Sequence, residues 1–283
     1  MRIRNPGIIK KQLYLFSILN RAVTLILAPA LIQRLIVYIN KKTMKRNIFI
    51  SFFLAFAATF YMSAQDLEKI LENHFNAIGQ ENLLKIETIE ATGKAFSMGM
   101  ETKLTMLNKR PNKIKVTIDF QGNQIIQAYD GETAWMINPM AGLPGAIELT
   151  GAEAVAFSES SDMDGQLWKY QEKGHQLELV GTEKMDDDEA YVLKLTKNTG
   201  NTDHYYLNKD SYLIMRVKST SVMNGSEVNT ETNLSDYRKV KGYMMPFATS
   251  QVINGQPVNT IIFEEVKVNE GIDDAVFSKP AGN

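Results

Sequence analysis

The chain has 283 residues, of which 44% are hydrophobic and 22% are charged, as in an ordinary globular protein. This composition excludes a collagen, a disordered tail and a protein with many membrane spans. The sequence contains no cysteine, which excludes disulfides, thiol chemistry, cysteine-ligated zinc and an acylated cysteine anchor. The three histidines, His74, His175 and His204, are far apart in the sequence and offer little for a metal site or a catalytic triad.

Charge is distributed unevenly along the chain. Residues 1–65 contain basic side chains and no aspartate or glutamate. The rest of the chain holds 21 of the 31 basic residues and all 32 acidic ones, a net charge of −11. An acidic body repels phosphate backbones, so we expect no nucleic-acid partner.

Residues 44–65 have the pattern of a cleaved secretory signal peptide. Lys45 and Arg46 follow Met44, an apolar run follows them, and small residues precede Gln65. The apolar run is shorter than the roughly 20 residues that span a bilayer as a helix. The alternative interpretation is a tethering membrane helix. We expect cleavage near Ala64 or Gln65.

Residues 1–43 are basic and apolar, and fit neither a membrane span nor a core. Their longest apolar stretch lies between Arg21 and Arg34 and is interrupted by Pro29. We expect translation to begin at Met44, which would make residues 1–43 a gene-start artefact. The alternative is a basic, membrane-seeking extension. Residues 66–283 are expected to form one domain.

The expected domain begins with helices. From Asp66, apolar residues recur at helical spacing as far as Ile78, and Gly79 can end the helix in a left-handed conformation. A second short helix is expected at about residues 80–86. His74 is expected on the flank of the first helix.

Beyond Thr88 the hydrophobic period changes to two, which predicts strands. The clearest segment is Lys113–Phe120, in which apolar and polar side chains alternate. Turn signals such as Asp130-Gly131, Asn224-Gly225 and Asn254-Gly255 separate such segments. About ten or eleven strands at this spacing predict a single antiparallel sheet that is strongly curved or rolled.

One stretch, Pro139–Gly174, interrupts the strand pattern. Residues 140–147 are expected to be a loop, and short helices are expected at about residues 151–157 and 164–170. An insertion of this length is too long for a simple connector. We expect it to cover one side of the sheet.

A rolled sheet covered by helices can enclose a ligand cavity. The large, adaptable apolar residues in and around the insertion and near a later turn are the candidates for its lining. The alternative is that these side chains simply fill the core. The candidate cavity and cover residues are Trp135, Met136, Met140, Leu143, Phe157, Leu167, Trp168, Met244, Met245 and Phe247.

The sequence lacks the motifs of common catalytic and metal sites. It has no glycine-rich phosphate loop, no His-Glu-x-x-His and no Gly-x-Ser-x-Gly. Asp162–Gly165 resembles the start of a calcium loop but lacks the later ligands, so helix capping is the better interpretation. Asp186–Glu189 is expected at a hairpin tip. We therefore expect no catalytic residue, metal or cofactor, and no enzymatic activity.

Several segments together resemble one family. They are Ala77–Leu83, Tyr129–Pro139, Asp164–Tyr170, Met245–Phe247 and Asp273–Phe277. In this order and spacing they are similar to the outer-membrane lipoprotein-sorting (LolA/LolB-like) proteins of Gram-negative envelopes. The resemblance covers about residues 67–280.

This resemblance implies an unclosed antiparallel β-barrel of about eleven strands covered by helices. It also implies a periplasmic carrier whose cavity shelters the acyl chains of lipoproteins, or other lipids, on their way to the outer membrane. The implied partners are the lipidated cargo and an inner-membrane ATP-driven release complex, with transient membrane contact. Without a cysteine, the soluble carrier form is expected rather than the anchored receptor. The alternative is an envelope module that binds a small apolar ligand or a protein partner without lipoprotein transport.

Overall fold

The computed structural model describes residues 66–281, apart from residues 98 and 224–225. The predicted signal peptide and the segment before it, residues 44–65 and 1–43, lie outside the described residues. Within the described residues, no helix combines the length and the hydropathy that crossing a membrane would require.

The described chain begins with two helices that meet at a glycine. Residues 66–78 are helical, and α3 (Gln80–Leu83) follows. Gly79 between them has φ 74° and ψ 46°, the left-handed conformation that the sequence predicts. A Cβ atom at this position would lie 2.2 Å from the carbonyl oxygen of Gly242, so the helix end can approach the sheet this closely only because residue 79 is glycine. α3 is shorter than the helix predicted over residues 80–86.

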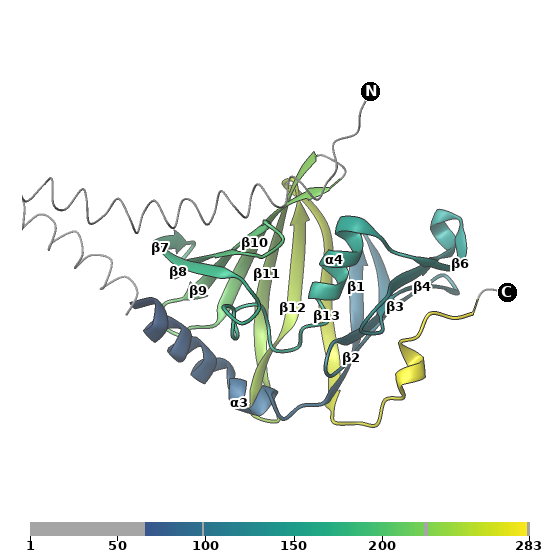
Figure 1. The fold of residues 1–283 in the computed structure, drawn as a ribbon, viewed down its shortest axis with the longest axis horizontal. Helices are drawn as coiled ribbons and strands as arrows, with labels where there is room; N and C mark the ends of the chain where they lie inside the picture. The colour runs from purple at the N-terminus through teal and green to yellow at the C-terminus, as the bar shows by residue number, and fades with distance from the viewer. Residues whose placement is uncertain (1–65, 98, 224–225, 282–283) are drawn as a thin grey trace, which may run out of the picture. The chain divides into compact units, whose positions relative to one another are not determined.

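All of the strands belong to one antiparallel sheet (Figure 1). The strands are β1 (Thr88–Ser97), β2 (Met100–Lys109), β3 (Lys113–Phe120), β4 (Asn123–Tyr129), β5 (Ala134–Asn138), β6 (Leu143–Glu148), β7 (Gln176–Met185), β8 (Asp188–Thr196), β9 (Thr202–Asn208), β10 (Ile214–Met223), β11 (Ser226–Val240), β12 (Tyr243–Ile253) and β13 (Gln256–Val268).

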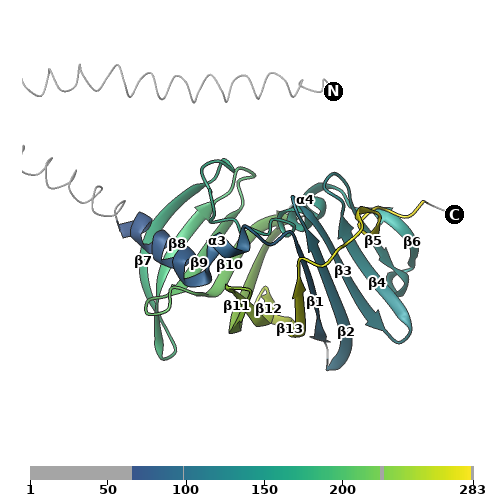
Figure 2. The ribbon, with the colours of Figure 1, turned by 90° about the horizontal axis from the view of Figure 1, so that it is seen from below.

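The strand order is β6-β5-β4-β3-β2-β1-β13-β12-β11-β10-β9-β8-β7. The first and last strands therefore pair in the middle of the sheet, and β6 and β7 form its two unpaired edges. Figure 2 shows the two halves of the sheet, with β2–β6 on one side of β13 and β7–β11 on the other. An unclosed, antiparallel sheet covered by helices confirms the predicted fold class, with 13 strands in place of about eleven.

Residues 140–147 were expected to be a loop, and this expectation is wrong. A short 3₁₀ helix, η1 (Pro139–Ala141), leads into β6, which pairs with β5. β6 contains Pro144 and Gly145, two residues of low strand propensity that make this segment resemble a loop in the sequence. Proline is tolerated here because β6 is an edge strand, where one row of backbone groups needs no partner.

The rest of the insertion contains one helix rather than two. α4 (Gly151–Glu159) confirms the first predicted helix. Residues 164–170 form turns rather than the second, because Gly165 and Lys169 have positive φ values of 79° and 51° and interrupt any regular helix.

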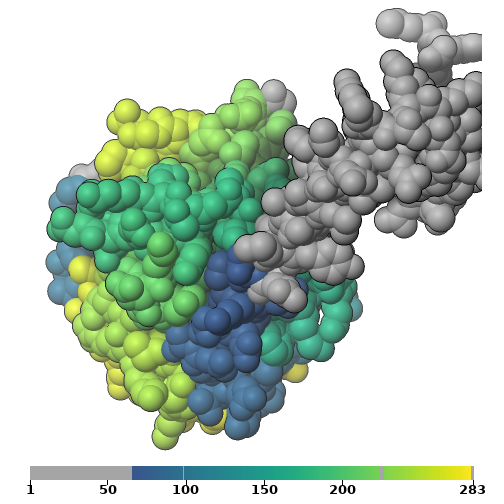
Figure 3. Space-filling model, turned by 90° about the vertical axis from the view of Figure 1, so that its left-hand side faces the viewer, coloured from purple at the N-terminus to yellow at the C-terminus, as the bar shows by residue number. Residues whose placement is uncertain are grey.

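The helices pack on one face of the sheet, which we call the inner face. In the space-filling view, the helix over residues 66–78 (dark blue) lies directly against the green strands (Figure 3). Two apolar clusters form between helices and sheet. The first contains Leu83, Ile86, Ile89, Ala91, Ala95, Leu104, Met245, Phe247 and Phe263. The second contains Leu67, Ile70, Leu71, Leu167, Leu193, Leu195, Tyr205 and Leu207.

Candidate ligand-binding site

A half-open cavity of about 310 Å³ is lined by residues of both apolar clusters. Its walls come from the helix over residues 66–78, α3, the turn around Gly165 and strands β9–β12. Apolar side chains dominate these walls. We call it the inner cavity, because it lies on the inner face of the sheet. It is lined by His74, Phe75, Ile78, Leu83, Met163, Asp164, Gly165, Gln166, Leu167, Tyr205, Ile214, Val217, Leu234, Tyr237, Tyr243, Met244 and Pro246.

Three tyrosines, Tyr205, Tyr237 and Tyr243, are among the residues that line this cavity. Burial raises the pKa of Tyr243 to about 12 and also raises the pKa values of Tyr205 and Tyr237, so all three phenols are neutral at physiological pH. The Tyr237 hydroxyl donates to the carbonyl oxygen of Ile214 at 2.8 Å. The Tyr205 hydroxyl lies 3.5 Å from a carboxylate oxygen of Asp203.

His74 also lines the cavity and is 3% exposed, so it is buried rather than on the helix flank. Its Nδ1 atom lies 2.7 Å from the carbonyl oxygen of Tyr212, between β9 and β10. Burial lowers the pKa of His74, and the bond to this carbonyl opposes the shift only in part. The imidazole is therefore neutral at physiological pH.

The chain between β6 and β7, residues 149–175, crosses the inner face from one half of the sheet to the other, and we call it the crossing segment. Its helix α4 contacts both β5 and β10, which are far apart in the strand order. None of the α4 residues is buried, although the helix contains Val155 and Phe157. α4 thus lies over the inner face without a buried residue of its own.

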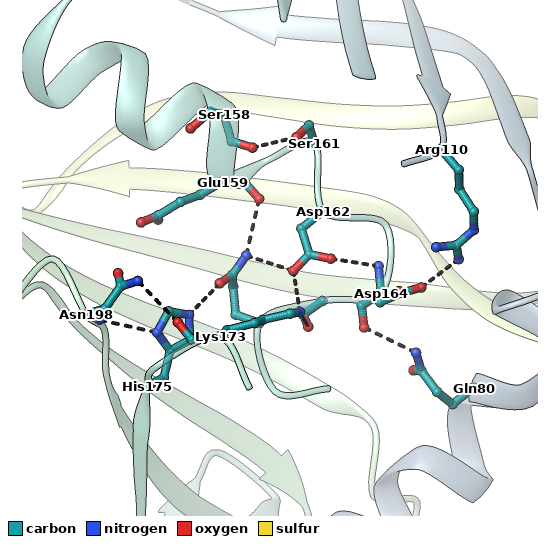
Figure 4. Close-up of polar contacts among 12 residues, drawn as sticks. Gln80, Arg110, Ser158, Glu159, Ser161, Asp162, Asp164, Lys173, His175 and Asn198 are labelled. Carbon is teal, nitrogen blue, oxygen red and sulfur yellow. Dashed lines mark hydrogen bonds and ion pairs between the residues drawn. The ribbon is translucent and has the colours of Figure 1, made fainter. Parts of the chain in front are cut away.

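Polar contacts add to the apolar packing of Leu167 in holding the crossing segment in place (Figure 4). Arg110, at the turn after β2, donates to the carboxylate of Asp164 at 2.6 Å. The same guanidinium donates to the carbonyl oxygens of Leu83 and Ile86 at 3.1 and 2.7 Å. Arg110 therefore joins the sheet, the C-terminal end of α3 and the crossing segment at one point.

The crossing segment is also braced internally by Asp162. Its carboxylate accepts from Lys173 at 2.5 Å and from the Gln166 amide at 3.0 Å. Gln166 in turn meets His175, whose other ring nitrogen accepts from the backbone N–H of Asn198 at 3.2 Å (Figure 4). These bonds occupy the carboxylate of the calcium-loop-like motif and link the segment to the β8–β9 turn.

A buried charge cluster attaches the end of α4 to β8 and β9. Lys197 lies 2.7 Å from Glu159 and 2.9 Å from Asp203. Burial alone would lower the pKa of Lys197, but the two carboxylates outweigh it and the net shift is upward. Lys197 therefore stays charged, which a buried ion pair requires.

The residues that the sequence proposes for the cavity fall into several places. Leu167 and Met244 line the inner cavity. Trp168 packs edge-on against Phe75, with ring centroids 4.9 Å apart, and lines an adjoining groove of about 380 Å³. Phe157 lies half-buried on α4.

The remaining candidates lie away from the cavity lining. Met245 and Phe247 are buried in the first apolar cluster beside the cavity. Met136 pairs with Ile147 at the β5–β6 edge. Met140 is 56% exposed in η1, and Leu143 begins β6.

Trp135 lies on the other face of the sheet from the cavity. It pairs with Ala128, and the register places both on the outer face. Its indole N–H donates to the carbonyl oxygen of Phe277 at 2.8 Å, and both residues are fully buried. The chain after β13 crosses the outer face here, held by Asp274 against Lys109 and by a bond from Lys115 to Val276.

The sequence does not identify Arg110 or Asp164 as site residues, and it marks Tyr243 only as part of an apolar turn. Arg110 stands before Pro111, in what reads as an ordinary turn, and its partners come from segments far along the chain. Only the apolar run around Tyr243 marked that turn. Among the described residues, no group of three or more histidine, aspartate or glutamate side chains is arranged to hold a metal ion.

The domain is an open antiparallel sheet with a half-open cavity beneath its helices and the crossing segment. The same fold occurs in a LolA superfamily protein from Nitrosomonas europaea, with a TM-score of 0.51 and 16% identity, over 75% of this chain and 97% of that one. An outer membrane lipoprotein-sorting protein domain from Vibrio parahaemolyticus has a TM-score of 0.51 and 11% identity, over 72% and 96%. A DUF1329 family protein from Desulfovibrio piger has a TM-score of 0.52 and 14% identity, over 74% of this chain and 97% of that one.

The fold is therefore that of the LolA superfamily and of outer membrane lipoprotein-sorting domains. No protein-family model matches the sequence, and no curated protein matches it.

Proposed function

We propose that this chain is a periplasmic carrier that holds an acyl chain, of a lipoprotein or another lipid, in the inner cavity. The observation that carries the proposal is the cavity itself, an apolar space of about 310 Å³ on the covered face of an unclosed sheet. The sheet is of the kind found in lipoprotein-sorting domains. A predicted signal peptide at residues 44–65 supports export.

Burial of an acyl chain supplies the affinity. Each methylene removed from water contributes about 0.8 kcal/mol, so even part of a chain in the cavity gives useful binding. The crossing segment supplies the release. Arg110 and Lys197 hold it by ion pairs to Asp164 and Glu159, and such polar contacts can be exchanged for water when the segment moves.

We propose carriage rather than catalysis. The cavity presents neutral tyrosines and a neutral His74, and the carboxylate of Asp164 is paired with Arg110. An acyl chain can enter such a site without meeting an activated nucleophile. Cargo loading from an inner-membrane ATP-driven complex and delivery toward the outer membrane, with transient membrane contact, complete the proposal.

The test is a dye-binding comparison of two matched variants. Val217 lines the inner cavity, whereas Val180, on β7, is 58% exposed. Val217→Phe fills the cavity and should weaken binding of the apolar dye N-phenylnaphthylamine about tenfold, whereas Val180→Phe should leave it unchanged. Equal binding by the two variants would show that the dye, and by inference an acyl chain, does not occupy the inner cavity.

A second experiment separates lipoprotein carriage from the alternative function. Exposed apolar residues around α4 and β6, namely Met140, Ile147 and Val155, favour a module that binds a protein partner. The whole chain should be expressed in a Gram-negative host, purified from the periplasm and extracted with organic solvent. Acylated peptides in the extract support lipoprotein carriage, whereas an extract with only small apolar molecules, or with none, supports the alternative.

A further inference from the structure

One end of the inner cavity lies where the first helix meets the β11–β12 turn. Gly79 contacts Gly242 closely, and the Asn82 amide donates to the Gly242 carbonyl oxygen at 3.2 Å. These contacts hold the start of β12, where Tyr243 lies, against the end of the helix that carries His74. Tyr243 and His74 both line the cavity.

The Tyr243 hydroxyl is available to donate a hydrogen bond to a ligand. The Tyr237 hydroxyl is bonded to Ile214 and the Tyr205 hydroxyl faces Asp203. The Tyr243 hydroxyl has no hydrogen-bond partner among the residues that the structure describes. Its burial-raised pKa of about 12 keeps the proton in place, so Tyr243 is a neutral donor within the cavity.

His74 provides an acceptor. A carbonyl oxygen can only accept, so the 2.7 Å contact with Tyr212 requires the proton of the neutral ring to be on Nδ1. Nε2 then carries a lone pair, and within the described part of the chain it has no protein donor. Burial keeps the pKa of this ring low and thereby preserves the lone pair.

Gln80 adds a second acceptor next to the cavity. Its amide nitrogen donates to the backbone oxygen of Asp164 at 3.3 Å, and Asp164 is part of the cavity wall. The Gln80 side chain is 2% exposed, and its Oε1 atom has no partner. A buried acceptor without a donor is costly, and a ligand donor or a water molecule would relieve that cost.

From this arrangement we infer that the inner cavity selects lipids whose polar end is neutral and both donates and accepts hydrogen bonds, such as an amide or a hydroxyl. The inference rests on the proposed function. The ligand would accept from Tyr243 and donate to His74. An ionised carboxylate or phosphate is disfavoured, because it has no hydrogen-bond donor for His74.

The test compares three ligands of equal chain length, lauramide, lauryl alcohol and laurate, by displacement of N-phenylnaphthylamine at about pH 8, where the fatty acid is ionised in water. The wild-type protein should bind lauramide and lauryl alcohol at least about tenfold more tightly than laurate. Equal affinity for all three, or tighter binding of laurate, would overturn the inference while leaving acyl binding intact. Failure of all three to bind would refute the proposed function itself.

Three variants assign the selectivity to its residues. His74→Asn should reduce the preference for lauramide over laurate several-fold and leave laurate affinity unchanged. Asparagine can still donate to Tyr212 from the position of Nδ1, so the variant keeps that bond while it removes the Nε2 acceptor. Tyr243→Phe should weaken the binding of lauramide and laurate alike, because both can accept from the phenol. Tyr237→Phe is the matched control, because its hydroxyl is already bonded to Ile214, and it should change neither affinity. A preference for lauramide that survives His74→Asn would overturn the assignment.

Discussion

Replacing Arg110 by alanine should both destabilise the protein and loosen the cover of the inner cavity. The guanidinium is 17% exposed and its partner Asp164 is 22% exposed, so the ion pair is largely shielded from solvent. The same side chain serves two carbonyl oxygens at the end of α3, those of Leu83 and Ile86. Arg110→Ala removes all three contacts at once.

The expected loss is about 3 kcal/mol in the free energy of unfolding. A hydrogen bond to a charged group contributes about 1.5 to 3 kcal/mol, and removing one partner of a buried pair costs about 3 to 5 kcal/mol. The contributions overlap, and residual exposure weakens the pair, so the lower end applies. The control is Lys169→Ala, which removes an ion pair with Glu172 in the same segment. That pair is 54% and 69% exposed, so its loss should cost less than about 0.5 kcal/mol.

Urea unfolding monitored by tryptophan fluorescence measures both changes. A double-mutant cycle with Asp164→Ala isolates the pair, for which we expect a coupling energy of about 1 to 3 kcal/mol. Stopped-flow dye release should be faster in Arg110→Ala than in the wild type, because the crossing segment has lost its attachment to α3. A stability loss for Arg110→Ala no larger than that for Lys169→Ala would refute this account of how the segment is held.

Three further predictions concern other parts of the domain. Burial lowers the pKa of His175 in the folded protein, so as the pH falls the unfolded chain takes up this proton at a higher pH than the folded one does. The free energy of unfolding should therefore decrease below about pH 6.5, and His175→Gln should reduce this pH dependence in urea unfolding. Trp135→Phe leaves the buried carbonyl oxygen of Phe277 without a donor and should lower stability by about 1 to 2 kcal/mol, while dye affinity stays unchanged; a change in affinity would contradict its outer-face position. Gly79→Ala should cost at least about 2 kcal/mol in thermal or urea unfolding, since its Cβ meets Gly242; a neutral result would rule out that close contact.

Local signals in the sequence predict much of the fold. The alternation over Lys113–Phe120 identifies β3, and the glycine at position 79 identifies the end of the first helix. The two-residue tip of the β7–β8 hairpin, Asp186 and Asp187, lies where its acidic run predicts a turn. β6 was missed because Pro144 and Gly145 have low strand propensity, and only its pairing with β5 reveals it.

The site was harder to predict, because its residues meet only in the folded chain. Trp135 and Met136 are adjacent and both apolar, and the sequence does not say which of them faces inward. The answer depends on Phe277, which covers the outer face from the far end of the chain. The contact between Arg110 and Asp164 likewise joins segments that no local pattern connects.

The pairing of β1 with β13 has a consequence for how the chain acquires its structure. Strands β1–β6 and β7–β13 are each built from hairpins between neighbours in sequence, so each half can assemble early. Among the described strands, the β1–β13 pairing is the one that joins the two halves. It must await the last strand, since contacts of long sequence separation form slowly. Until β13 arrives, the hydrogen-bonding edge of β1 stays bare. A polypeptide threaded through a membrane from its amino end would expose this unpaired, aggregation-prone strand edge throughout translocation. A chaperone that shields the edge would improve the yield of folded protein.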